Sequence, residues 1–406
     1  MNIEKIPVNQ PQNGDTCLVG LSGGVDSSLT AILLKERGCK VICVTMSVWK
    51  NDLPLESSKT GIRTSCYGPD EHIDIEQCEI FCKEQGFEYH VIDCGSTYKE
   101  HVLEYYKSTY RKGLTPNPCI MCNPYVKFGA LLEGADKMGL SYDYFCTGHY
   151  AALVRPKKPL NEVYESMESV QNDTRKAFSS NISDSVYLHP VMIDGAFDKT
   201  KDQGYFLYRV PSKIFEKVRF PLSAMKKTEV VAMAKAHNLV SADRTESQDF
   251  IPSEYLDVLF SDKPSVPGDI VEFGTGKKLG EHRGIEHYTI GQRKGLGIAM
   301  NHPVYVQALD AEKNQVVLGE NDDLLQDSIT IADCVWAGNY VPQKPFKAYV
   351  KIRFASKPAM AVITPICLGE DASYTIQFEK PVRAVAPGQS AVIYMDSMIL
   401  GGGIIQ

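Results

Sequence analysis

The first 150 residues alternate between short apolar runs and longer stretches in which apolar positions recur at helical spacing. Short runs of this kind are typical of buried strands, and the helical stretches end at glycines such as Gly38 and Gly86. The pattern predicts strands over 16–19, 41–44, 89–92 and 142–145, and helices over 29–38, 73–85, 98–110 and 127–138. Because strands and helices alternate, we expect an α/β domain: a doubly wound parallel sheet with helices on both faces.

The remainder of the chain changes in character twice. Residues 155–198 are polar and mixed with little period, which predicts a mobile surface insertion, and the next unit contains one amphipathic helix over 228–237. From residue 301 onward, short alternating runs separated by Gly, Pro, Asn and Asp predict an all-β unit, a small barrel. We therefore expect three domains, over 1–210, 211–300 and 301–406.

Composition narrows the class of protein. A chain of 406 residues is too long for a single core, which agrees with several domains. No apolar run reaches the length of a membrane span and no signal peptide is recognised, so we expect a cytoplasmic protein without membrane contact. The twelve cysteines are scattered, and several lie in apolar strands, as in a reducing compartment. Because the net charge is −7, any RNA has to be held by local basic patches.

A glycine- and serine-rich loop joins the first predicted strand to the first predicted helix. Backbone N–H groups at a helix N-terminus lack partners within the helix, and with the helix dipole they favour a phosphate or pyrophosphate. The loop is neither a Walker A motif, which needs Gly-Lys-Ser/Thr, nor GxGxxG. The candidate ATP-binding residues here are Gly20, Leu21, Ser22, Gly23, Gly24, Val25, Asp26, Ser27 and Ser28. A glycine-rich turn without a ligand is the alternative.

Two other strand ends carry candidate nucleotide-binding residues. Ligands of open parallel sheets bind beyond the carboxyl ends of the strands. Met46 lies at the end of the second predicted strand, and Gly148 and His149 follow the fourth. We therefore expect the adenine nucleotide at this edge of the sheet, although His149 could also be a core histidine.

The segment 115–123 is the second candidate site. Pro116 and Pro118 stiffen it and keep it extended, and Cys119 and Cys122 follow at Cys-x-x-Cys spacing just before a predicted helix. Thiols in such a motif can have a lowered pKa and act as nucleophiles. Half of a zinc site and a pair of inert structural cysteines are the alternatives, and a closed zinc site would need distant partners.

Six motifs in a fixed order carry a resemblance. Ser-Gly-Gly-x-Asp-Ser in the loop resembles the PP-loop of ATP pyrophosphatases, which cleave ATP to AMP and pyrophosphate. It is followed by Thr-Pro-Asn-Pro-x-x-x-Cys-Asn, Thr-Gly-His-Tyr, Lys-Asp-Gln-x-Tyr-Phe-Leu-Tyr, His-Tyr-Thr-Ile-Gly-Gln-Arg-Lys-Gly-Leu-Gly-Ile, and Pro-Gly-Gln-Ser-Ala before Gly-Gly-Gly-Ile-Ile. Together they resemble the MnmA-type tRNA-specific 2-thiouridylases over nearly the whole chain. The resemblance implies a PP-loop domain, a small central domain and a C-terminal β-barrel.

The resemblance also implies a reaction in which sulfur replaces the 2-oxygen of the wobble uridine of a tRNA, at the expense of ATP with Mg²⁺. Adenylation makes the 2-oxygen a leaving group, a sulfur nucleophile supplied by a donor protein or sulfide attacks C2, and the base has to leave the anticodon stack. By resemblance, Asp26 helps to hold the magnesium–pyrophosphate group and Cys122 is the nucleophile. The implied base and tRNA contacts are Asn117, Pro118, Cys119, His149, Lys201, Asp202, Gln203, Arg293, Lys294, Arg353, Phe354 and Gln389. For the basic residues, a solvated charged surface is the alternative.

The chain departs from the family pattern at two positions. The usual pattern has Asp where this chain has Cys119, and a persulfide-carrying cysteine where this chain has Asp249. In a first hypothesis, Cys119 becomes the sulfur carrier and cycles with Cys122 through persulfide and disulfide. In a second, Cys119, Cys122 and Asp249 hold an iron–sulfur cluster with one open iron. In a third, thiolation is degraded and Asp249 is a polar loop residue.

Two other functional classes stay open. A PP-loop ligase or amidotransferase acting on a small molecule would need neither the paired thiols nor a basic surface for RNA. A tRNA-binding protein that kept only the fold would bind tRNA without releasing pyrophosphate. Turnover of ATP to AMP that depends on added tRNA would separate these classes from a sulfurtransferase.

Overall fold

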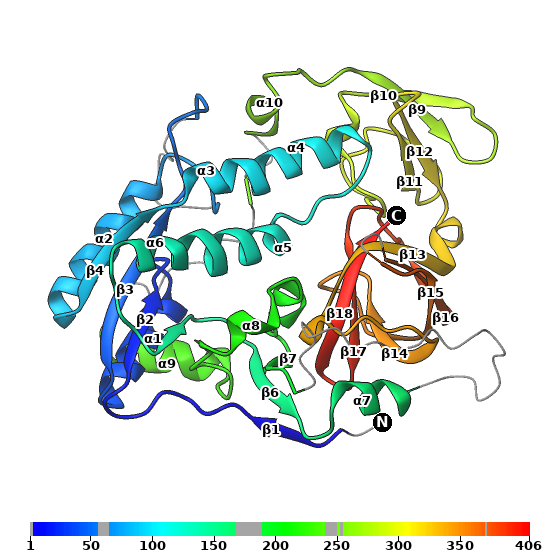
Figure 1. Cartoon of the computed structure of the whole chain (residues 1–406). Coiled ribbons are helices and arrows are strands. Elements are labelled where there is room, and N and C mark those ends of the chain that lie inside the picture. The colour runs from blue at the N-terminus through cyan, green and yellow to red at the C-terminus, as the bar shows by residue number, and fades with distance from the viewer. Residues whose placement is uncertain (1–2, 56–64, 168–188, 240–249, 252–254, 370–371) are drawn as a thin grey trace.

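The computed structural model describes residues 3–55, 65–167, 189–239, 250–251, 255–369 and 372–406. Figure 1 shows an α/β domain on one side, a β-barrel in orange and red on the other, and a smaller β-rich unit beside the barrel. Among the described residues, no helix has both the length and the apolar character needed to cross a lipid bilayer.

Parallel strands form the sheet of the N-terminal domain in the spatial order β4-β3-β2-β5-β8. They are β2 (Thr16–Gly20), β3 (Lys40–Ser47), β4 (Glu88–Asp93), β5 (Tyr144–Cys146) and β8 (Val218–Arg219). The chain builds outward from β2 through β3 to β4 and then crosses to β5 and β8 on the other side. The order therefore reverses between β2 and β5, and open α/β sheets bind their ligands at such a switch point.

Helices cover both faces of this sheet, which confirms the predicted doubly wound arrangement. Cys17 and Val19 of β2 pack against α1 and α2 on one face, whereas Leu18 packs on the opposite face with the helices around α6. Neighbouring residues separate in this way because successive strand side chains point to opposite faces. The helices are α1 (Val25–Glu36), α2 (Glu71–Gln85), α3 (Gly95–Tyr98), α4 (Glu104–Arg111), α5 (Pro118–Cys122), α6 (Leu131–Lys137) and α9 (Lys227–Ala236).

Two of these helices contain π-helical turns. The segment η1 (Lys99–Leu103) joins α3 to α4, and η2 (Asn123–Ala130) joins α5 to α6. The helix predicted over 127–138 therefore starts earlier than expected, at Pro118. Proline is well tolerated at the first helical position because its missing N–H would have no partner there. The prediction that the thiols lie in an extended segment was wrong, because both belong to this helix.

The segment 155–198, expected to be a mobile insertion, is partly built into the fold. β6 (Ala152–Pro156) pairs with β1 (Lys5–Pro7) and β7 (Met192–Asp194) in a small antiparallel sheet. Between them, α7 (Leu160–Glu165) buries its apolar side chains in the same cluster as the barrel. A helix this short gives too few repeats for its period to be recognised in the sequence. Residues 168–188 lie outside the described residues.

The C-terminal strands close into an antiparallel barrel, as predicted, in the order β13-β16-β15-β14-β17-β18. They are β13 (Leu325–Trp336), β14 (Phe346–Lys351), β15 (Ala359–Cys367), β16 (Ser373–Arg383), β17 (Ser390–Met395) and β18 (Met398–Ile405). A separate sheet contains β9 (Gly268–Glu272), β10 (Lys278–His282), β11 (Tyr305–Asp310) and β12 (Gln315–Gly319). The runs at 304–306 and 316–318 belong to this sheet and not to the barrel, because β12 pairs with β9. Alternation identifies a strand but does not identify its pairing partner.

Short helical elements connect these units. They are η3 (Gly204–Leu207), α8 (Ser212–Phe215), α10 (Leu256–Leu259), η6 (Ile285–His287), η7 (Asp322–Leu324) and η8 (Ala337–Asn339). Arg111 at the end of α4 and Asp262 beyond α10 form an ion pair of 3.0 Å, which ties the β-rich unit to the α/β domain.

Candidate functional site

The glycine-rich loop after β2 is a tight turn held by its own serine side chains. The Ser22 amide donates to Ser27 Oγ over 3.2 Å, and the hydroxyls of Ser27 and Ser28 donate to the Gly24 carbonyl over 3.0 and 3.1 Å. Gly23 adopts a φ of +73°, a left-handed conformation that glycine takes without strain. These contacts fold the loop closely over the N-terminus of α1.

The first turn of α1 offers backbone donors to an anion. Its N-cap, Gly24, has no side-chain acceptor, and the amides of Val25, Asp26 and Ser27 have no acceptor in the described part of the chain. The positive end of the helix dipole adds to these donors. A phosphate or pyrophosphate fits this arrangement.

The side chain of Asp26 is held by two groups that come from distant elements. Lys227 Nζ, at the start of α9, lies 2.8 Å from Oδ1 and 2.7 Å from Oδ2 of Asp26. The Tyr150 hydroxyl donates to Oδ1 over 2.9 Å. A carboxylate is a ligand that Mg²⁺ prefers, and the Lys227 ammonium is a second positive group beside the donors of α1.

The end of β5 forms the second wall of the candidate nucleotide site. A Cβ placed on Gly148 would lie 2.8 Å from the Asp26 carbonyl carbon and 2.9 Å from the Ser27 amide nitrogen, so only glycine allows this approach. Met46, near the end of β3, is half-buried and packs on the apolar core beneath. The loop, Met46 and Gly148 therefore lie at the ends of three adjacent strands, β3, β2 and β5.

The thiol-bearing helix is fixed by contacts from a distant part of the chain. The Thr115 amide donates to the Pro387 carbonyl over 2.8 Å, and Gln389 Nε2 donates to the Pro116 carbonyl over 2.8 Å. The buried Asn117 then forms the N-cap of α5. A loop of the C-terminal barrel thus orients the segment that leads into the thiols.

Cys119 and Cys122 lie one helical turn apart on α5. Cys119 is exposed and Cys122 is half-buried, and a spacing of three residues in a helix puts both on one face. Although the Cys119 residue reaches the surface, protein atoms closely surround both sulfur atoms, and this raises the pKa of Cys119 to about 11 and that of Cys122 to about 12, while Lys127 acts in the opposite direction on both. The lowered pKa expected from the motif was therefore wrong for this state: the cost of removing a thiolate from water exceeds the effect of the nearby cation.

A third thiol approaches this pair from another segment. Cys66 is exposed and interacts electrostatically with both Cys119 and Cys122. Its neighbour Tyr67 is buried and stacks on Tyr98 with ring centres 5.4 Å apart, which fixes the segment against α3. No sequence motif marks Cys66, because its approach to the pair depends on this packing.

A metal at the thiols finds no support among the described residues. In that part of the chain, no three His, Cys, Asp or Glu side chains gather closely enough to hold a metal ion. Asp249, the third ligand of the iron–sulfur hypothesis, lies outside the described residues.

His149 and Lys127 connect the glycine loop with the thiols. His149 follows the glycine that packs on α1, and its Nδ1 lies 2.7 Å from Thr147 Oγ1. Burial, and secondly the charge of Lys127, hold the pKa of His149 well below its usual range, so the imidazole is neutral. Because Lys127 also interacts with Cys119 and Cys122, the two candidate sites approach each other across His149 and Lys127.

The Lys-Asp-Gln segment lies beside the same strand end. The Gln203 amide donates to the Tyr150 carbonyl over 2.7 Å, and Gln203 Oε1 accepts from the Tyr150 amide over 2.9 Å. Asp202 accepts from the Gly204 amide over 2.9 Å, and burial raises the pKa of its carboxyl group. The half-buried Lys201 precedes them. Contact of these three residues with RNA stays a prediction.

Family models match the chain in three successive parts. They are described as a tRNA methyl transferase HUP domain at residues 15–252, a tRNA methyl transferase PRC-barrel domain at 256–320 and an aminomethyltransferase beta-barrel domain at 326–405. A protein of Endomicrobium trichonymphae named tRNA-specific 2-thiouridylase MnmA is 40% identical over 390 residues, which cover 96% of this chain and 98% of that protein. The chain belongs to the MnmA family. A protein of the same name from Acetivibrio thermocellus is 34% identical over 394 residues, which cover 96% of this chain and 98% of that protein.

The basic residues predicted to contact tRNA have two different environments in this MnmA-family chain. Arg293 and Lys294 are exposed and form no ion pair in the described part of the chain. Arg353 instead donates through Nη2 to the carbonyls of Ile290 and Ala384. Its guanidinium therefore joins the loop that carries Arg293 to the barrel, and this internal role is separate from the predicted contact with RNA.

Phe354 lies in an exposed aromatic and basic cluster. Phe354 is 40% exposed and contacts Phe206 with ring centres 4.5 Å apart and the rings tilted by 30°, and Lys351 Nζ lies 5.5 Å from the centre of the Phe354 ring. Aromatic rings beside a cation are the groups on which unpaired bases stack. The cluster fits the predicted role of Phe354, which stays a prediction.

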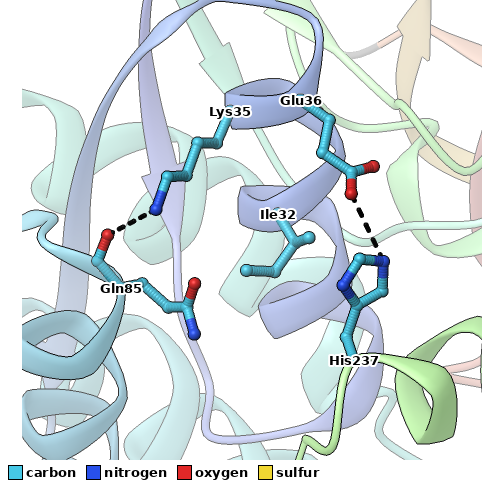
Figure 2. A pocket seen from close by; sticks show the side chains of 5 residues that line it. All are labelled: Ile32, Lys35, Glu36, Gln85 and His237. Carbon is cyan, nitrogen blue, oxygen red and sulfur yellow. Dashed lines mark hydrogen bonds and ion pairs between the residues drawn. The ribbon is translucent and has the colours of Figure 1, made fainter.

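Figure 2 shows a hollow at the opposite end of α1 from the glycine loop. It measures about 350 Å³ and is lined by Ile32, Lys35, Glu36, Gln85 and His237. His237 Nε2 lies 3.5 Å from Glu36 Oε1, and Lys35 Nζ donates to the Gln85 carbonyl over 2.7 Å. Because it lies away from the strand ends that carry the MnmA motifs, the hollow is not the nucleotide site.

Sequence reasoning missed two lysines of the candidate site. Lys227 starts an amphipathic helix, where a lysine is usually solvated, and only the packing of α9 against α1 brings it to Asp26. Lys127 had one signal: Pro124 lies just before the helix predicted over 127–138, and a proline inside a helix changes the hydrogen-bond register of the turns that follow.

Proposed function

We propose that this chain is an ATP-dependent tRNA sulfurtransferase that replaces the 2-oxygen of the wobble uridine by sulfur. The observation that supports the proposal is that Lys127 interacts electrostatically with both thiols and with His149, which lies beside the glycine loop. One site offers anion-binding donors at the start of α1, and the other offers paired thiols on α5. The names of the family members agree with tRNA thiolation. A small-molecule ligase would need only the first site.

The first step is activation of the uridine. The amides of Val25, Asp26 and Ser27 are suited to bind the pyrophosphate part of ATP, and Asp26 is suited to hold its Mg²⁺. The metal neutralises phosphate charge when it is bound. The uridine 2-oxygen attacks the α-phosphorus of ATP, pyrophosphate leaves, and the base is joined to AMP through that oxygen.

The second step is sulfur transfer. A donor protein that carries a persulfide transfers its outer sulfur to the Cys119 thiol and is left as a thiol, and Cys119 is a residue at the surface where such a donor can approach. The terminal sulfur attacks C2, the bond from C2 to oxygen breaks, and AMP leaves with the electron pair. Cys122 then attacks the Cys119 sulfur, the thiouridine leaves, and a Cys119–Cys122 disulfide forms. An external dithiol returns both residues to thiols by supplying two electrons.

The tRNA has to present a single unstacked base to these groups. Asn117 and Pro118 at the start of α5 are the candidate walls of the base pocket, and the neutral His149 is a candidate hydrogen-bonding partner. The exposed Arg293 and Lys294 are candidates for phosphate contacts. Unstacking costs a few kcal/mol, which the backbone contacts have to supply.

Reconstitution tests this proposal directly. Purified protein is mixed with ATP, Mg²⁺, a persulfide donor, a dithiol and unmodified tRNA, and 2-thiouridine is measured by mass spectrometry. Wild type should form 2-thiouridine together with AMP and pyrophosphate, and Cys119→Ser and Cys122→Ser should not. Cys367→Ser, an exposed cysteine on β15, is the matched control and should keep full activity.

Each alternative has its own outcome in the same experiment. Pyrophosphate release without added tRNA would indicate a small-molecule ligase. Binding of tRNA without pyrophosphate release would indicate an RNA-binding protein. Activity of Cys119→Ser would exclude Cys119 as sulfur carrier, and Asp249→Ala tests whether that carboxylate takes part. Iron measured after anaerobic purification decides between the disulfide pathway and an iron–sulfur cluster.

A further inference from the structure

Lys127 is a cation at the centre of the candidate site. It lies on η2, it is half-buried, and its ammonium forms no hydrogen bond or ion pair in the described part of the chain. Removing a charge from water is costly unless an opposite charge or hydrogen-bond acceptors compensate. A lysine kept in this state therefore suits a position where an anion arrives with the substrate.

The π-helical register explains why Lys127 points toward the thiols. Pro124 has no N–H to donate to the Ile120 carbonyl, and the ladder shifts, so that Leu131 N–H bonds to the Val126 carbonyl five residues before. In an α-helix, five residues would rotate Lys127 about 140° away from Cys122. One π-helical turn instead brings positions five apart to the same side.

A glycine is required for this register. A Cβ on Gly129 would lie 2.8 Å from the Pro124 carbonyl oxygen, again five residues before. Pro124 and Gly129 therefore act together to form the π-helical turn that carries Lys127. π-helical turns of this kind occur frequently at functional sites.

The surroundings of Lys127 place it between the two candidate sites. On one side the positive charge of Lys127 lowers the pKa of Cys119 and Cys122. On the other side the same charge lowers the pKa of His149, which directly follows Gly148, the glycine that packs against Asp26. The ring of Phe128, the next residue along η2, lies 5.9 Å from the ring of His149, which agrees with this placement.

We propose that Lys127 is a catalytic residue that binds the phosphate group joining the adenylated uridine to AMP. This inference rests on the proposed function, because only uridine adenylation puts such a phosphate between the nucleotide loop and the thiols. When the perthiolate attacks C2, the bond from C2 to oxygen breaks and the electron pair stays on the oxygen of AMP. Negative charge therefore grows at the phosphate, and a fixed cation stabilises this transition state without transferring a proton.

The competing role for Lys127 is to stabilise a Cys122 thiolate. That role acts on the free enzyme, whereas the phosphate role acts only on the adenylated tRNA. Two measurements separate these roles. Thiol alkylation without tRNA reports on the thiolate role, and thiolation with tRNA reports on the phosphate role.

The experiment compares Lys127→Gln and Lys127→Arg with Lys137→Gln. Lys137 lies on α6, in the same continuous helix, and is exposed, so its variant is the matched control. Full-length proteins are tested in single turnover with ATP, Mg²⁺, a persulfide donor and unmodified tRNA. Melting temperature and tRNA affinity verify that each variant folds.

Thiouridine formation should fall on the order of 100-fold in Lys127→Gln, the loss typical of removing one transition-state charge contact, and Lys127→Arg should recover most of it. Alkylation of Cys122 by iodoacetamide at pH 8, without tRNA, should fall by much less than thiolation, because Lys127 lowers the pKa of this thiol less than burial raises it. The proposal is overturned if Lys127→Gln matches Lys137→Gln in thiolation. It is also overturned if alkylation falls in parallel with thiolation, which would assign Lys127 to the thiolate. A wild type without thiouridine would refute the proposed function itself, and this inference with it.

Discussion

Lys227 and Asp26 form an ion pair across the N-terminus of α1, with Lys227 Nζ 2.7 Å from Oδ2 and 2.8 Å from Oδ1 of Asp26. The two residues are 201 positions apart in the chain. They meet because α9 packs on α1 through a shared apolar cluster. The ion pair therefore ties the candidate phosphate-binding loop to the helix that follows the sheet.

Replacing Lys227 by Met should destabilise the protein. The two side chains are largely buried, with 14% of Lys227 and 26% of Asp26 exposed. Loss of the ion pair should therefore lower the free energy of unfolding by roughly 1–2 kcal/mol. Urea unfolding measures this loss, with Lys137→Met as control because Lys137 is exposed and forms no ion pair in the described residues. Equal midpoints for the two variants would show that the pair contributes nothing to stability.

The paired thiols should react slowly at neutral pH. Burial raises the pKa of Cys119 to about 11 and that of Cys122 to about 12, so the thiolate fraction keeps rising through pH 10. Alkylation at these residues, followed by peptide mass spectrometry, should increase about tenfold per pH unit between pH 8 and 10, whereas a free peptide thiol levels off near pH 8.5. A plateau below pH 9 at both residues would contradict the assignment.

The same thiols should make the fold sensitive to alkali. A thiol whose pKa is raised on folding is neutral in the native state while the unfolded chain already ionises, so its stabilising contribution is complete below about pH 8.5 and is lost as the pH rises toward about 11 to 12. The urea midpoint of wild type should therefore fall between pH 9 and 11. Cys119→Ser with Cys122→Ser should show a smaller fall, and an unchanged dependence would count against the raised pKa values.

Gln389 should matter for turnover more than for tRNA binding. Its side-chain amide is already engaged with the Pro116 carbonyl, 2.8 Å away, and so holds the segment that leads into α5. Gln389→Ala removes one hydrogen bond worth about 1 kcal/mol and should lower the thiolation rate roughly fivefold with an unchanged Kd for tRNA. A raised Kd with an unchanged rate would indicate that Gln389 contacts tRNA directly.

Arg293 and Lys294 should account for part of the salt dependence of tRNA binding. Both are exposed on a loop and have no carboxylate partner in the described part of the chain. If each contacts a phosphate, replacing both by Gln should reduce the slope of log Kd against log salt by up to about 2. The slope is measured by titration at several salt concentrations, and an unchanged slope would remove this loop from the tRNA surface.

Local patterns predicted the elements of the α/β domain well. The run at 16–19, the helix ended by Gly86 and the helix over 228–237 correspond to β2, α2 and α9. Such elements are set by period and by end signals within about a dozen residues. The start of α5 was missed because Pro118 suggested extended backbone, whereas proline at the first helical position is compatible with a helix.

The features of the candidate site also fall into two groups: those that a local pattern predicts, and those that depend on the tertiary structure. The sequence alone determined the glycine-rich loop before a helix, the spacing of Cys119 and Cys122, and the family, because each is a property of neighbouring residues or of motif order. The tertiary structure alone decided that Lys227 reaches Asp26, that a barrel loop holds the Pro116 carbonyl, and that Lys127 lies between His149 and the thiols. These contacts join residues far apart in the chain, and their partners are selected by packing and by the cost of burying charge, which no local pattern encodes.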